Sequence, residues 1–111
     1  MSIRILMSLI FLLPVYVSAA TVDCGYGDVG NLHVQSARSD GSSYNNKLIV
    51  ELLGDRDGCP IYGYVSNTDP AYSSILSMLL AAKMSQVQIR ILINNNELLS
   101  SAARIETVNF K

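Results

Sequence analysis

Apolar and polar side chains alternate along residues 31–36, where Leu32 and Val34 face one way and their neighbours face the other. This period of two is typical of a half-buried strand. Residues 47–53 form a second predicted strand, with apolar side chains on both faces. A strand that is apolar on both faces indicates a sheet that curls into a barrel or is covered by a second layer. The chain before the first strand is predicted to be flexible because it contains Gly25, Gly27 and Gly30.

A third strand is predicted at residues 61–65, after a glycine-bounded turn at residues 54–58. Ile61, Gly63 and Val65 alternate along it with two tyrosines, Tyr62 and Tyr64. A glycine in the middle of a strand indicates a bulge or a tight bend.

One helix is predicted after the third strand. Asp69 can cap it, and Pro70 suits its first helical position. Apolar side chains then recur at steps of three and four residues as far as Lys83, which gives one wide apolar face. The residues of this face are Tyr72, Ile75, Leu76, Leu79 and Leu80, widened by Met78 and Ala82.

Two further strands are predicted at residues 87–93 and 103–110, separated by a loop at residues 94–96. Strict alternation breaks at Ile105 and Val108, which indicates a bulge in the last strand. The fold class is therefore mainly β with one α-helix, in the order of three strands, a helix and two strands.

The first twenty residues have the features of a secretory signal peptide. Arg4 supplies a positive charge, residues 5–17 are mostly apolar, and small residues follow at the spacing that signal peptidase reads. The apolar stretch is too short for a bilayer-spanning helix, which needs about 20 apolar residues. Cleavage after Ala19 or Ala20 fits equally well. We therefore expect a signal peptide at residues 1–20, one domain at residues 21–111, and a secreted or periplasmic protein without a membrane span after cleavage.

Both cysteines, Cys24 and Cys59, lie in the expected mature chain. An isolated pair in an oxidising compartment predicts one disulfide. In the chain-entropy model, closing a loop of this length contributes about 3–4 kcal/mol to stability. Two cysteines and the single histidine, His33, are too few for a structural metal site, so neither a metal nor a cofactor is expected.

The formal net charge is −1, and the basic residues do not cluster. This distribution argues against a nucleic-acid partner. His33 is predicted on a polar strand face and no nucleophile pattern accompanies it, so we do not expect an enzyme. Asp55 and Asp57 lack the ligand spacing of a calcium loop and are predicted to form a solvated turn.

The order of elements is similar to the OB-fold, a small five-stranded barrel, here with one helix between the third and fourth strands. The chain also resembles the B subunits of AB5 toxins, in the group of subtilase cytotoxin and typhoid toxin. Four segments carry the likeness: Leu32–Val34, Cys59 shortly before Tyr72, Leu80–Ala82 followed by Val87–Ile91, and Ala102–Ile105. The resemblance implies an OB-like barrel in a non-enzymatic protein that binds a cell-surface glycan. It also implies a homopentamer and an enzymatic A subunit as partner.

Three residues are predicted to contact the glycan: Tyr26, Asp28 and Tyr44. An exposed aromatic ring near a carboxylate offers a sugar one stacking plane and directional hydrogen-bond acceptors. Strand propensity explains tyrosines in these segments equally well. The alternative function is a stand-alone monomeric accessory protein of the periplasm or extracellular space, without glycan binding.

Overall fold

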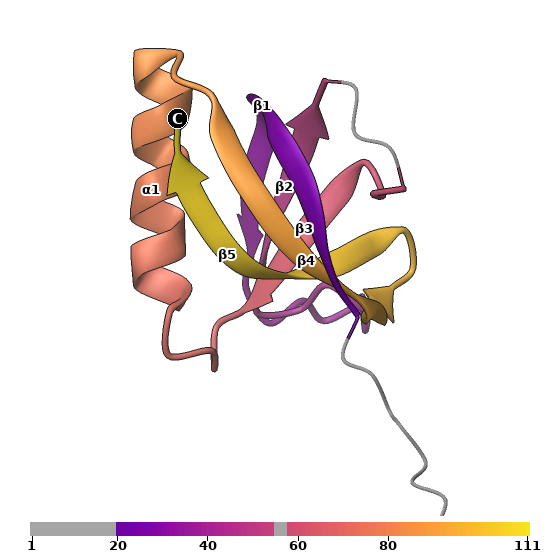
Figure 1. Ribbon diagram of the computed structural model, residues 1–111. Coiled ribbons are helices and arrows are strands. Elements are labelled where there is room, and N and C mark those ends of the chain that lie inside the picture. Colours follow the sequence, from indigo (N-terminus) through magenta and orange to yellow (C-terminus); the bar gives the residue numbers. More distant parts are fainter. Residues whose placement is uncertain (1–19, 55–57) are drawn as a thin grey trace, which may run out of the picture.

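The computed structural model describes residues 20–54 and 58–111. The predicted signal peptide lies outside the described residues apart from Ala20, as do Asp55 and Asp57 of the predicted solvated turn. The described chain is mainly β with one helix, as predicted (Figure 1). Its elements are β1 (Thr21–Gln35), β2 (Lys47–Leu53), β3 (Tyr62–Ser66), α1 (Tyr72–Ser85), β4 (Ile89–Leu99) and β5 (Ala102–Phe110).

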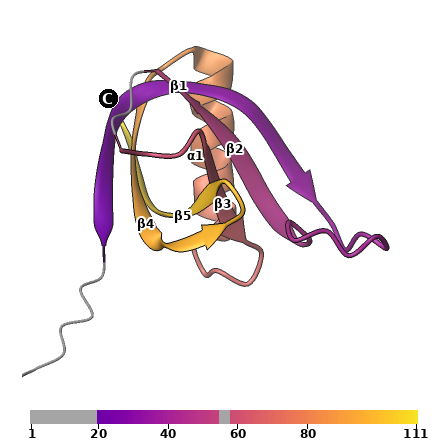
Figure 2. The ribbon, with the colours of Figure 1, turned by 90° about the vertical axis from the view of Figure 1, so that its right-hand side faces the viewer.

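Each strand pairs with two others, so the sheet closes into a barrel in the order β1-β2-β3-β5-β4. All neighbours are antiparallel except β3 and β5, which run parallel. Figure 2 shows how closure is achieved, because β1 arches across the barrel from β4 to β2. The pairing between β3 and β5 is short, and beyond Arg104 the described pairing of β5 is with β4 alone.

The predicted flexible segment before the first strand is wrong, because β1 already begins at Thr21. Its first half pairs with β4 and its second half with β2, and the register shifts once in each half. Gly25 lies at the first shift with φ +71, a conformation that glycine adopts without steric cost. Gly27 and Gly30 are buried within the strand. The glycines therefore accompany a bent, ordered strand.

The bulge or bend predicted at Gly63 is also wrong. The pairing of β2 with β3 is continuous past this residue. A Cβ atom at Gly63 would lie 2.7 Å from Cγ1 of Ile105, so the absence of a side chain makes room for Ile105 on the neighbouring strand β5. The third strand was predicted to begin at Ile61, but this residue precedes β3 and is exposed.

The fourth strand is longer than predicted. Residues 94–96 were expected to form a loop, but they belong to β4, which continues to Leu99. Asn94 still pairs with Thr21 and Arg104, and the ladder to β5 is irregular between Asn94 and Leu98. The bulge predicted in the last strand is confirmed, because the pairing skips Glu106 between Ile105 and Thr107.

The helix begins slightly later than predicted. Asp69 does not cap it; the N-cap position is Ala71, without a side-chain cap. The Asp69 carboxylate instead accepts a hydrogen bond from the backbone N–H of Ala71, at 2.9 Å. At the other end Gln86 adopts the left-handed conformation, and the N–H of Val87 bonds to the carbonyl of Ala82.

Helix α1 lies against the barrel and completes its core (Figure 1). Ile75, Leu79 and Ala82 are its buried residues. Lys83 extends its side chain to donate a hydrogen bond to the Gly30 carbonyl, at 2.6 Å. In residues 20–54 and 58–111, no helix has the length and hydropathy needed to cross a membrane.

The two apolar faces of β2 are both covered, as predicted. Leu48 and Val50 point into the barrel core, whereas Ile49 points outward into a second apolar cluster. The predicted disulfide between Cys24 and Cys59 is also confirmed, with a Cα–Cα distance of 5.9 Å. It joins the first half of β1 to the segment that enters β3.

Candidate functional site

The outer face of β1, β2, β3 and β5 brings side chains from distant parts of the chain together. The strand registers place His33, Ile49, Tyr64 and Arg104 in one row across the four strands. Side chains alternate between the two faces of each strand. The neighbours Leu48 and Val65 therefore fill the core while this row faces outward.

An outer-face cluster covers the middle of this surface. Ile49, Tyr64 and Ala102 are its buried members, and Tyr44, Tyr62 and Leu99 pack against them. Ala102 is 0% exposed although its side chain lies outside the barrel. The tyrosines thus form a second packed layer, which gives this face a defined shape.

Two adjoining hollows form on the cluster, and we call them together the outer groove. The polar hollow has a volume of about 230 Å³ and is lined by His33, Gln35, Tyr44, Ile49, Tyr62 and Ser101. The apolar hollow has a volume of about 410 Å³ and is lined by Pro60, Ile61, Tyr62, Leu98, Ser100 and Ser101. Tyr62 and Ser101 line both, so one ligand could contact both hollows at once.

The polar hollow presents hydrogen-bonding groups that the protein itself does not use. Within the described part of the chain, neither the His33 imidazole nor the Tyr62 hydroxyl has a hydrogen-bond or ion-pair partner. Gln35 is more constrained, since its Oε1 atom accepts bonds from Arg38, at 3.1 Å, and from Ser42, at 3.4 Å. The hollow therefore offers one fixed amide and two uncommitted polar groups to a ligand.

Two tyrosine hydroxyls hold the wall of the outer groove in place. Tyr44 donates to the carbonyl of Leu99, at 3.1 Å, and Tyr64 donates to the carbonyl of Glu97, at 3.4 Å. Both carbonyls flank Leu98, which lines the apolar hollow. Burial, followed by the nearby Glu97 carboxylate, raises the pKa of Tyr64 above its usual value of 10.0. The Tyr64 phenol therefore stays protonated, and remains a donor, at neutral pH.

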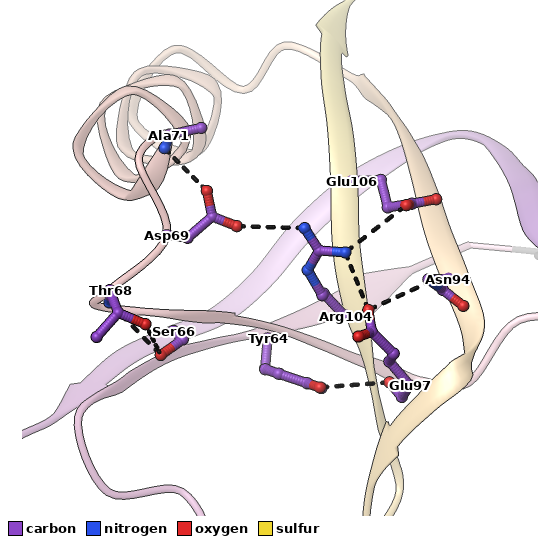
Figure 3. Close-up of polar contacts among 9 residues, drawn as sticks. All are labelled: Tyr64, Ser66, Thr68, Asp69, Ala71, Asn94, Glu97, Arg104 and Glu106. Atoms are coloured by element: carbon purple, nitrogen blue, oxygen red, sulfur yellow. Dashed lines mark hydrogen bonds and ion pairs between the residues drawn. The ribbon is translucent and has the colours of Figure 1, made fainter. Parts of the chain in front are cut away.

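An ion-pair cluster centred on Arg104 supports the same wall (Figure 3). The guanidinium lies 2.9 Å from the carboxylate of Glu97 on β4. It also lies 3.6 Å from Asp69, before α1, and 3.7 Å from Glu106 on β5. The hydrogen bond to Glu97 is the main cause that raises the pKa of Arg104. A side chain bound in this way positions β4 and the helix entrance, and we assign Arg104 a structural role.

The structure does not bring the three predicted glycan contacts into one hollow. Tyr44 lines the polar hollow, whereas Asp28 lines a separate hollow of about 510 Å³ beside Lys83 and Gln86 at the end of α1. Tyr26 is exposed on β1, with the Lys111 ammonium 5.9 Å from its ring centroid. The roles of Tyr26 and Asp28 stay predictions.

Sequence reasoning did not select Tyr62, His33 or Leu98 as site residues. Tyr62 carried a usable signal, because it alternates outward on a strand whose neighbour, β2, is apolar on both faces. His33 was assigned to the polar face of its strand, and it is exposed there. Nothing in the sequence pattern indicated Leu98 as a site residue, because it reaches the groove only through the extension of β4 beyond the predicted loop.

Among residues 20–54 and 58–111, no group of three or more His, Cys, Asp or Glu side chains could hold a metal ion. Comparisons of the chain with protein-family models, curated proteins and solved structures found no match. The case for a function therefore depends on the outer groove and on the residue pattern.

Proposed function

We propose that this chain is a secreted or periplasmic, non-enzymatic binding protein that recognises a glycan through the outer groove. The observation that carries the proposal is Tyr62, a half-buried ring shared by both hollows, with a hydroxyl that lacks a partner in the described residues. The apolar face of a pyranose ring packs on such a ring, and its hydroxyls need nearby polar groups. His33 and Gln35 supply these groups in the polar hollow.

Two further features support the proposal: the strand order supports the likeness to toxin B subunits, and the disulfide supports export. The strand order β1-β2-β3-β5-β4, with one helix between β3 and β4, supports an OB-type barrel. An enzymatic A subunit, as in those toxins, belongs to the same proposal. The disulfide supports export, because such bonds persist in oxidising compartments.

Binding is tested on a glycan array with residues 21–111 and with variants of equal folded content. Tyr62→Ala is expected to weaken binding at least about tenfold, as the loss of a central aromatic contact does. Tyr62→Phe keeps the ring and removes the hydroxyl, so we expect a smaller loss. Tyr26→Ala removes an exposed tyrosine ring on β1, outside the outer groove, and is the comparison for Tyr62→Ala on β3. Normal binding by Tyr62→Ala, with loss in Tyr26→Ala and Asp28→Ala, would place the site at the originally predicted residues and refute the outer groove.

The proposed homopentamer is tested by native mass spectrometry. Helix α1 leaves a large apolar residue uncovered at Met84, which is 83% exposed, and Leu80 is also exposed. A ring in which helices meet would cover them, so we expect a five-fold mass that Met84→Glu reduces to the monomer. Ser39→Glu, in the exposed segment between β1 and β2, is the control and should leave the mass unchanged. A monomeric mass for the unmodified protein would favour the stand-alone accessory protein.

A further inference from the structure

The apolar hollow needs an explanation beyond sugar recognition. In the proposed function the sugar ring occupies the polar hollow, where His33, Gln35 and Tyr44 line the surface and its hydroxyl groups find polar neighbours. The adjoining apolar hollow is larger and has no charged residue in its lining. Ile61 and Leu98, at 62% and 56% exposed, present apolar surface to solvent there. Clustered apolar exposure of this kind marks an interaction site more often than single exposed residues do.

The walls of the apolar hollow are fixed before any ligand arrives. Pro60 and Ile61 directly follow Cys59, which the disulfide ties to β1. The carbonyl of Ile61 accepts a hydrogen bond from the N–H of Leu52, at 2.7 Å. On the opposite side Leu98 pairs with Ala103. A site whose walls are already held loses little conformational entropy when it binds.

From these observations we infer that the natural ligand is amphiphilic: a glycan joined to an alkyl chain, with the sugar in the polar hollow and the chain in the apolar hollow. The inference rests on the proposed glycan binding. Tyr62 and Ser101 line both hollows, so the two hollows adjoin at these residues. A ligand with its glycosidic bond above Tyr62 would extend its sugar to one side and its alkyl chain to the other. An uncharged apolar lining suits an alkyl chain better than a peptide segment with its polar backbone.

Matched glycosides separate the two contributions. Binding of the methyl and octyl β-glycosides of glucose, galactose and mannose is measured by calorimetry, below the concentrations at which the octyl compounds form micelles. For at least one sugar, the octyl glycoside should bind at least about tenfold more tightly than the methyl glycoside, because burial of each methylene is favourable. Leu98→Ser and Ile61→Ser should each remove most of this gain, which is measured as the ratio of octyl- to methyl-glycoside affinity within the same variant.

The control variant is Phe110→Ser, which removes an exposed apolar side chain at the opposite end of β5 from Ala102. It should keep the octyl gain. The inference is overturned if no octyl glycoside binds more tightly than its methyl counterpart, or if Phe110→Ser lowers the gain as much as Leu98→Ser. It is also overturned if Leu98→Ser changes the oligomeric mass, since the hollow would then be a contact between copies.

The same measurements distinguish failure of the inference from failure of the proposed function. Array binding that depends on Tyr62, without an octyl gain, leaves glycan recognition intact and refutes the alkyl site. Octanol that binds as tightly as the octyl glycosides, together with a negative array, refutes both, because the hollow would then bind alkyl chains regardless of the sugar.

Discussion

Replacing Cys24 and Cys59 together by alanine is expected to lower the free energy of unfolding by about 3–4 kcal/mol. The bond closes a segment with a sequence separation of 35, so its loss restores conformational freedom to the unfolded chain. Alanine is preferable to serine because Cys24 belongs to the barrel core, where a hydroxyl would be buried without a partner. Small domains have a total stability of only about 5–15 kcal/mol, so the loss is a large share of it.

Urea unfolding followed by circular dichroism measures this effect. With an m-value of about 1.5–2 kcal/mol per M, the midpoint should fall by roughly 2 M. Reduction of the unmodified protein should produce a similar fall, whereas a reductant should not change the midpoint of the double variant. An unchanged midpoint in the double variant would contradict the expected gain in conformational freedom of the unfolded chain.

The disulfide could be predicted because only one cysteine pair is possible, and the helix because its pattern lies within one segment. Two cysteines allow one intramolecular pair, and no proline interrupts the apolar repeat of α1. The bulge in β5 was visible for the same reason, since Ile105 and Val108 break a period of two. Each of these predictions needed only the sequence of one segment or the number of cysteines.

The bent first strand could not be predicted because its partners are distant in sequence. Gly25 occurs in a glycine-rich segment that is typical of flexible chains. Only pairing with β4, more than sixty residues away, shows that the segment is a strand. The extension of β4 through residues 94–96 has the same cause. An asparagine run indicates a loop, and only the pairing of Asn94 and of Leu98 with distant residues of β5 shows that the strand continues past it.

The candidate site was predictable only in part. Tyr44 was selected from the sequence, and it lines the polar hollow. The other lining residues come from β1, β2, β3 and the β4–β5 turn, which meet only when the barrel closes. A pattern can show that a tyrosine faces outward, but the barrel register decides which other outward residues lie beside it.

The close contact between Gly63 on β3 and Ile105 on the neighbouring strand β5 provides the second prediction with a large expected effect. Ile105 is 1% exposed and occupies the space above Gly63. Ile105→Ala is expected to lower the free energy of unfolding by about 3–5 kcal/mol, in the upper part of the range for such truncations. The high value follows because Gly63 has no side chain that could move into the void. Ile61→Ala, at an exposed position, is the matched control and should cost no more than about 0.5 kcal/mol.

Adding a methyl group at Gly63 tests the same contact from the opposite side. In the unmodified protein Gly63→Ala should cost about 1–3 kcal/mol, because the new Cβ would lie 2.7 Å from Cγ1 and 2.8 Å from Cδ1 of Ile105. When Ile105→Ala is already present, both of these atoms are gone, and the nearest remaining atom is the Ala103 carbonyl oxygen, at 3.6 Å. Gly63→Ala should then be neutral or stabilising. Urea unfolding of the four proteins gives the coupling energy, and strict additivity of the two substitutions would contradict direct packing between residues 63 and 105.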